Sequence, residues 1–357
     1  MKIATVVGAR PQFVKASMVS RALAESNSGV EEVIIHTGQH YDANMSQVFF
    51  DELEIPHPKY NLGIGGGSHG ENTGRMIESI EKVLLKERPT WLLVYGDTDS
   101  TLAAAIAASK ISIPIAHVEA GLRSFNRLMP EEVNRVVTDH VADILFTPTT
   151  SATAQLVKEG IPAQKIHQVG DVMHDAALHF AMIAKEKSDI ICEVGLQEKK
   201  YILVTLHRQE NTDNCERLTE ILSGLSSSQL PVVWPMHPRT QARLEQFGLQ
   251  VPDIVRVIKP VGYLDMIMLE KNACLIATDS GGVQKEAFFY SVPCLTLRDE
   301  TEWVELVNVG ANRLVEAKAE VLAAELRLNR GPVSNRLNLY GGGAASVEIS
   351  SVMVGGH

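Results

Sequence analysis

Two apolar segments of strand length enclose an alanine-rich segment, and this order limits the fold more than any other feature of the chain. The segments are Trp91–Tyr95 and Ile113–Val118, and the residues between them, TLAAAIAASK, favour a helix. Two strands that are joined through a helix run parallel. We therefore predict an α/β fold with a parallel sheet, whose ligand site lies at the carboxyl ends of its strands.

Acidic residues follow both of these strands. Asp97 comes just after the first strand, and Glu119 comes directly after the second. Pro130 suits the first position of a helix, which places Glu131 in its opening turn. We predict that these three carboxylates converge on one site. Asp97 has two alternative interpretations: a cap of the following helix, or part of a metal-binding Asp-x-Asp with Asp99, against which stands the start of a helix inside that triplet.

Length and charge exclude several classes of protein. A chain of 357 residues is too long for one ordinary core, so two domains are expected. The formal net charge of −10, with no run of Lys or Arg, argues against a nucleic-acid partner. We recognise no signal peptide and no apolar stretch of membrane-spanning length, which favours a cytoplasmic protein. The four cysteines lack disulfide or metal-ligand spacing and are expected to be reduced, buried thiols.

The first half of the chain repeats the strand-helix pattern. Further strands are expected at Ile3–Val7, Val33–His36 and Ile144–Phe146. Arg10 and Lys15 follow the first of them and supply cations for an anionic ligand. The glycine-rich stretch 63–74 is interpreted as a mobile loop before a helix at 75–86, with a phosphate cradle as the alternative. In the opening turn after Pro130, the second acid, Glu132, is expected at the helix surface.

The second half repeats the same pattern after a boundary near Gly170. Five strands are expected, at Tyr201–Leu206, Val232–Met236, Ile254–Ile258, Cys274–Ala277 and Pro293–Leu297. The fourth strand runs into Asp-Ser-Gly-Gly and then a helix, so backbone N–H groups of Ser280, Gly281 and Gly282 could meet a diphosphate at the positive end of that helix. A plain glycine turn is the alternative. Glu286, about one turn further, would face ligand or solvent and suits ribose hydroxyls.

Seven motifs in order, spread over almost the whole chain, carry a family resemblance. They are GARPQFVK, YGDTDS, HVEAGLRS, MPEEVNR, LHRQEN, MHP and TDSGGVQKEA. Together they resemble the non-hydrolysing UDP-N-acetylglucosamine 2-epimerase family. The resemblance implies two Rossmann-like domains of the glycosyltransferase-B type that face each other across a cleft: residues 1–169 joined by a helix at 344–357, and a UDP-binding domain at 170–343. It also implies a cytoplasmic homodimer that uses neither a metal nor a nicotinamide cofactor.

The resemblance implies a reaction as well. The family inverts C2 of a UDP-2-acetamido sugar by expelling UDP and adding it back to a glycal intermediate. By resemblance, the catalytic groups are Asp97, Glu119, Glu131 and His207. The implied ligand-binding groups are Arg10, Lys15, Ser280, Gly281, Gly282 and Glu286, and His237 either lines the site or has a structural role. A UDP-sugar glycosyltransferase of the same fold is the alternative function.

Departures from the common family pattern bear on the substrate. Residues 125–129 replace a Ser-Pro-Trp form, and the RDETEWVELV stretch lacks the usual proline. These features resemble the branch that acts on UDP-2,3-diacetamido-2,3-dideoxy-glucuronate for O-antigen or other surface polysaccharides. Arg127 would suit the C6 carboxylate of such a sugar. Gln39 matches one residue of a second, activating UDP-sugar site in some members, whereas Asp42 stands where another glutamine is expected.

Overall fold

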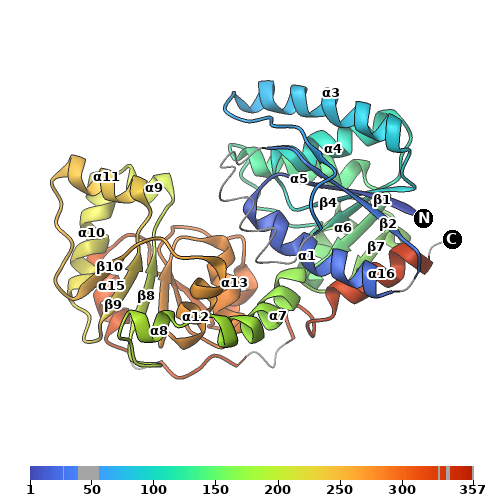
Figure 1. The fold of residues 1–357 in the computed structure, drawn as a ribbon. Coiled ribbons are helices and arrows are strands. Elements are labelled where there is room, and N and C mark those ends of the chain that lie inside the picture. The colour runs from blue at the N-terminus through green and yellow to red at the C-terminus, as the bar shows by residue number, and fades with distance from the viewer. Residues whose placement is uncertain (27, 39–55, 329, 335–337, 356–357) are drawn as a thin grey trace. The chain divides into compact units, whose positions relative to one another are not determined.

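The chain forms two compact units. The computed structural model describes residues 1–26, 28–38, 56–328, 330–334 and 338–355 (Figure 1). One unit comprises Met1–Ala176 with Leu339–His357, and the other comprises Ala177–Asn338. Each unit is built on its own sheet. We refer to them below as unit 1 and unit 2.

The sheet of unit 1 is entirely parallel, as the sequence predicts. Its strands are β1 (Lys2–Val7), β2 (Glu31–His36), β3 (Tyr60–Asn61), β4 (Trp91–Tyr95), β5 (Ile115–Val118), β6 (Ile144–Thr147) and β7 (Ile166–Gln168). The order is β3-β2-β1-β4-β5-β6-β7. The chain therefore reverses its direction of travel between β1 and β4. The carboxyl ends of these strands form the crevice where open α/β sheets bind their ligands.

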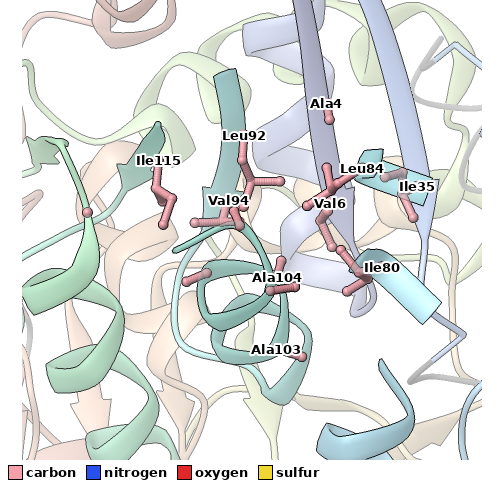
Figure 2. Close-up of a cluster of buried hydrophobic side chains, with 14 of the residues drawn as sticks. Ala4, Val6, Ile35, Ile80, Leu84, Leu92, Val94, Ala103, Ala104 and Ile115 are labelled. Atoms are coloured by element: carbon pink, nitrogen blue, oxygen red, sulfur yellow. The ribbon is translucent and has the colours of Figure 1, made fainter. Parts of the chain in front are cut away.

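Helices cover both faces of this sheet. They are α1 (Arg10–Glu25), α3 (His69–Glu87), α4 (Asp99–Lys110), α5 (Pro130–Val141) and α6 (Thr150–Lys158). The alanines of α4 place its backbone close to the sheet: Ala103 and Ala104 pack in one buried cluster with Leu92, Val94 and Ile115 (Figure 2). In that cluster α3 lies beside α4 and contributes Ile80 and Leu84. Small side chains thus let two helices share one face of the sheet.

Helix α3 begins earlier than expected. The sequence predicted a loop through residue 74, but the helix starts at His69, and the side chain of Ser68 caps it by accepting a hydrogen bond from the Glu71 N–H. Gly70 and Gly74 lower helix propensity, which is why the sequence pattern hid these turns. The pairing of His69 Nδ1 with Asp99 Oδ2 at 2.7 Å ties the start of α3 to the start of α4.

Unit 2 has a second parallel sheet. Its strands are β8 (Ile202–Thr205), β9 (Val232–Pro235), β10 (Val255–Ile258), β11 (Leu275–Thr278), β12 (Cys294–Thr296) and β13 (Asn312–Leu314), in the order β10-β9-β8-β11-β12-β13. Its helices are α8 (Ile190–Glu193), α9 (Gln209–Thr212), α10 (Cys215–Ser226), α11 (Pro238–Phe247), α12 (Tyr263–Asn272), α13 (Gly281–Phe289), α14 (Val304–Asn308) and α15 (Ala319–Leu326). The direction of travel reverses between β8 and β11, which makes their carboxyl ends the expected ligand crevice of this unit.

The chain leaves unit 1 within helix α7 (Val172–Lys187), and helix α16 (Ala345–Gly355) returns to unit 1. The start of α7 is held in unit 1, because Asp175 accepts hydrogen bonds from the backbone N–H groups of Ala345 and Ser346 at the start of α16. Helix α16 then packs against α1, where the Ser350 hydroxyl donates to the Ala22 carbonyl at 3.2 Å. These bonds explain why the compact units divide inside α7, whereas the sequence placed the boundary before this helix.

The cysteines and the helix lengths test two further expectations. All four cysteines are free, as expected, but Cys192 and Cys215 are exposed, so the expectation that all are buried was wrong. Cys192 lies on the short helix α8, and Cys215 is the first residue of α10. In both helices, other residues face the core. Within the described ranges, none of the helices combines the length and the apolar character that crossing a bilayer requires.

Candidate active site

Glu119 is the most constrained acid in unit 1. It lies at the end of β5 in the left-handed region, with φ of 71°, and forms an ion pair with Lys15 of α1; both side chains are only 10% exposed. Gly96 lies next to this pair and suits its own φ of 63°, and a Cβ there would be in ordinary contact with Lys15 Nζ at 3.5 Å. A bulky residue held at positive φ is costly and is characteristic of functional sites.

Asp97 lies at the end of the neighbouring strand, β4, and is held by a different cation. Arg135 of α5 donates from Nη2 to Asp97 Oδ2 at 2.5 Å, and the aspartate side chain stays 33% exposed. It does not cap the following helix, because Thr98 does so. Nor does it share a site with Asp99, which pairs instead with His69. Asp97 therefore presents a partly exposed carboxylate beside a buried guanidinium.

The two acids that open α5 have different environments. Glu131 is exposed in the first turn, and its convergence with Asp97 and Glu119 stays a prediction. Glu132, which was expected at the surface, is buried. It accepts hydrogen bonds from the backbone N–H groups of Ser124 and Phe125 at 2.8 and 2.9 Å and pairs with Arg135. Burial raises the pKa of Glu132, but these donors outweigh it and bring that pKa below the usual value.

Some residues implied by the resemblance lie outside the part of the chain that can be described. Arg10 opens α1, but its side chain is not among the described ones. Gln39 and Asp42 fall wholly outside the described residues. Their roles stay predictions.

In unit 2, a buried carboxylate holds His207 at the end of β8. The ring Nδ1 of His207 lies 3.2 Å from Oδ1 of Asp279, which follows β11; the histidine side chain is 55% exposed and the aspartate 0%. Asp279 also accepts hydrogen bonds from the N–H of Arg208 and from the side chain of Asn211. Burial raises the pKa of Asp279, yet its hydrogen bonds and the charge of His207 lower that pKa overall. An ionised Asp279 thus orients His207 and leaves most of its ring accessible.

Helix α13 begins with two glycines, Gly281 and Gly282, shortly after Asp279. Ser280 is the N-cap, and its hydroxyl accepts from the Val283 N–H at 3.5 Å. A Cβ on Gly281 would lie 2.5 Å from the Glu302 carboxylate, so a side chain there would displace that carboxylate. A Cβ on Gly282 would meet nothing closer than 3.9 Å, and this residue is exposed. The N–H groups at this helix start are therefore open to an anion on the Gly282 side.

Two acids lie side by side behind the start of α13. Glu286 is mostly buried, and one of its carboxylate oxygens lies 3.9 Å from the place of a Cβ on Gly282; its contact with a ligand stays a prediction. Glu270 of α12 is 1% exposed, and burial, together with the charge of Glu286, raises the pKa of Glu270 well above its usual range. Burial thus favours the protonated form of Glu270 beside Glu286.

His237 has the structural role that the sequence left open. It precedes α11, and its Nδ1 accepts a hydrogen bond from the Arg239 N–H at 3.2 Å, which caps the helix. Its side chain is exposed at the carboxyl end of β9. A ligand contact by the same ring stays a prediction.

Comparisons with known proteins agree with the motif pattern. The family model described as UDP-N-acetylglucosamine 2-epimerase matches residues 21–354. The chain is 54% identical over 359 residues to the UDP-2,3-diacetamido-2,3-dideoxy-D-glucuronate 2-epimerase of Pseudomonas aeruginosa, with 99% of each chain covered. It is 47% identical over 368 residues to the UDP-N-acetylglucosamine 2-epimerase of Methanocaldococcus jannaschii, with 100% of each covered.

Solved structures agree as well. The Methanocaldococcus jannaschii UDP-GlcNAc 2-epimerase in complex with UDP-GlcNAc and UDP matches with a TM-score of 0.89 and 47% identity, over 99% of both chains. The UDP-GlcNAc 2-epimerase from Neisseria meningitidis bound to UDP-GlcNAc matches with a TM-score of 0.87 and 30% identity, over 99% of this chain and 100% of that one.

Proposed function

The chain belongs to the UDP-N-acetylglucosamine 2-epimerase family, and from that membership we propose that it inverts C2 of a UDP-2-acetamido sugar without hydrolysing it. The observation that supports this most directly is the pair of carboxylates at adjacent strand ends. Glu119 is held by Lys15 and Asp97 by Arg135. Two acids with separate cationic partners suit a reaction that removes a proton from one face of a carbon and returns one to the other face.

The proposed reaction is an elimination followed by an addition. One carboxylate takes the proton from C2, the C1–O bond breaks, and its electron pair leaves with the β-phosphate of UDP. The glycal that remains is protonated at C2 on the opposite face, and UDP adds back to C1. Acid-base groups of this kind each contribute about 10²–10⁴ to the rate. We assign proton transfer at C2 to Asp97, Glu119 and Glu131.

We assign the binding of UDP mainly to unit 2. The diphosphate would lie against the N–H groups of Ser280, Gly281 and Gly282, with His207 beside them to balance its charge. Glu286 would accept hydrogen bonds from ribose hydroxyls. From unit 1, Arg10 and Lys15 would add positive charge to the leaving diphosphate.

The Gly282→Val substitution tests the diphosphate site. A Cβ on Gly282 is tolerated by the protein itself, so the added side chain should obstruct only the ligand. We expect the Kd for UDP to rise at least tenfold, about 1.4 kcal/mol, as measured by calorimetry. The matched control is Gly331→Val in the same unit, where the surroundings are also open. Equal affinity in Gly282→Val and wild type would contradict the assignment.

We propose the diacetamido-glucuronate as the preferred substrate. In the loop at 124–129, the backbone N–H groups of Ser124 and Phe125 donate hydrogen bonds to Glu132. The side chains of Phe125 and Leu128 are nevertheless 72% and 94% exposed. Phe125 is held at φ of 58°, a costly conformation for an aromatic residue. Apolar side chains held out in this way suit acetamido methyl groups, and the exposed Arg127 between them suits a carboxylate.

The Arg127→Met substitution separates the two candidate substrates. It keeps an unbranched, flexible side chain, although a shorter one, and removes its charge, so kcat/KM for the uronate should fall about tenfold, since a charge-assisted hydrogen bond contributes about 1.5–3 kcal/mol. Turnover of UDP-GlcNAc should be unchanged. Both substrates would be assayed with wild type, with Arg127→Met and with the exposed-site control Arg327→Met. An equal loss for both substrates would contradict a role in selecting the uronate.

The family resemblance extends the proposal beyond the chemistry. We propose a homodimer that works in the cytoplasm and supplies a sugar nucleotide for O-antigen or another surface polysaccharide.

A further inference from the structure

A buried ion pair lies beneath the two strand ends that carry Asp97 and Glu119. His117 of β5 and Asp139 of α5 are both 0% exposed, and Nδ1 of the histidine lies 2.8 Å from Oδ1 of the aspartate. The other ring nitrogen, Nε2, lies 2.8 Å from the carbonyl oxygen of Gly96, the residue before Asp97. A single side chain thus connects the interior of unit 1 to the turn that carries Asp97.

The partners of His117 determine its protons. A carbonyl oxygen only accepts hydrogen bonds, so Nε2 must donate to Gly96. Asp139 also receives a hydrogen bond from the guanidinium of Arg123 at 2.7 Å. The pKa of Asp139 is raised by burial but lowered overall by His117 and Arg123. The carboxylate of Asp139 faces Nδ1 of His117, so the ring is held between this carboxylate and the Gly96 carbonyl.

The same aspartate also holds the turn that carries Glu119. Oδ2 of Asp139 accepts a hydrogen bond from the Gly121 N–H at 3.1 Å. Gly121 lies at φ of 83°, and Glu119 just before it lies at φ of 71°. Left-handed backbone at a non-glycine residue persists only where its surroundings enforce it. The Asp139 carboxylate is one of the groups that enforce it here.

We propose that His117 is a positioning residue, which sets the distance between Asp97 and Glu119 by holding the Gly96 carbonyl on one side and, through Asp139, the Gly121 N–H on the other. Register supports this, since His117 pairs directly with Val94 on the neighbouring strand, so its ring reaches the turn at the end of that strand. The inference rests on the proposed function, because it assumes that Asp97 and Glu119 transfer protons.

Two substitutions separate the two hydrogen bonds. His117→Gln keeps a donor near the position of Nε2, and His117→Asn keeps one near the position of Nδ1. If the bond to Gly96 positions Asp97, kcat should fall at least tenfold further in His117→Asn than in His117→Gln. The Kd for UDP should stay unchanged in both, because the proposed UDP contacts lie mostly in unit 2. Deuterium exchange at C2 should fall in parallel with kcat.

The controls are His140→Gln and His140→Asn, on the same helix as Asp139, where the ring is exposed and its Nδ1 lies 2.8 Å from the Val136 carbonyl of its own helix. Equal losses of kcat in the two His117 variants, in proportion to their losses in Tm, would overturn the positioning role. Absence of turnover in wild type would refute the proposed function instead. In that case, or if the variants do not fold, ¹⁵N spectra of the wild-type histidines decide: a proton on Nε2 of His117, donated to the Gly96 carbonyl, is expected, and an unprotonated Nε2 would overturn the inference.

Discussion

Product formed in D2O should carry deuterium at C2, and Asp97→Asn should reduce that incorporation about 10²-fold or more while UDP still binds. Asparagine keeps the shape of the side chain and its place beside Arg135, but it lacks a basic oxygen. Because breakage of the C1–O bond accompanies loss of the C2 proton, an oxygen-18 label in the bridge to the β-phosphorus should also move to non-bridging positions. NMR follows both exchanges.

The control for this experiment is Asp253→Asn, at an exposed turn of unit 2. It should leave both exchanges at the wild-type rate. Epimerised product that retains protium at C2, with the bridging label unmoved, would refute elimination and with it the roles of Asp97, Glu119 and Glu131. Normal exchange in Asp97→Asn would refute the role of Asp97 alone.

Glu270→Gln should stabilise the protein increasingly as the pH rises above about 4.3, the ordinary value for glutamate. The native state keeps Glu270 protonated, because burial and Glu286 raise its pKa, whereas the unfolded state releases the proton. The native state therefore binds more protons, and stability falls with pH by up to about 1.4 kcal/mol per unit until the folded-state pKa is reached. Glutamine is neutral throughout and does not contribute this slope.

The measurement is the free energy of unfolding of wild type and Glu270→Gln between pH 5 and 8, by denaturant titration followed through the transition of unit 2. The difference between the two should widen steadily with pH. Glu193→Gln, on the exposed surface of α8, should follow wild type. A difference between Glu270→Gln and wild type that does not change with pH would show that Glu270 is ionised in the folded protein.

The strands that the sequence predicts share a property that the missed strands lack. The predicted strands are mostly apolar runs, as expected for a sheet covered on both faces, although β10, itself an edge strand, contains Arg256. The missed strands are β3, β7 and β13, all two or three residues long and all at a sheet edge. An edge strand needs a partner on only one side, so a segment such as Ile166–Gln168 forms it without an apolar pattern.

The site shows a similar limit. The positions of Asp97 and Glu119 follow from strand ends, which the sequence reveals. The roles of Arg135, which pairs with Asp97, and of Asp139, which accepts from the Gly121 N–H, do not follow in this way. Both lie inside α5, and only the packing of that helix in the fold decides which of its side chains reach the turns. The sequence also does not show which of Glu131 and Glu132 is buried. Hydrogen bonds from the loop before the helix decide this, and they select Glu132.

Glu270 is a case where a signal was present. It falls three residues after Ile267 and seven after Tyr263, so all three share one helical face, and the other two are buried. The helical period therefore predicts a buried Glu270. A carboxyl on such a face, in a helix that is otherwise mostly apolar there, is a reason to expect a neutral acid.

The path of the chain through its two units has a consequence for its biosynthesis. Because unit 2 occupies Ala177–Asn338 and unit 1 is completed by Leu339–His357, unit 2 is an insertion within unit 1. On the ribosome, all residues of unit 2 emerge before α16 does, so α1 waits without its packing partner while a later-made unit can already fold. Domains usually complete in the order of synthesis. Here unit 1 is the first whose synthesis begins, but it can complete its fold only after unit 2 has been made. Until then, the face of α1 that packs against α16 is uncovered, and this is the surface that a nascent-chain chaperone would need to shield.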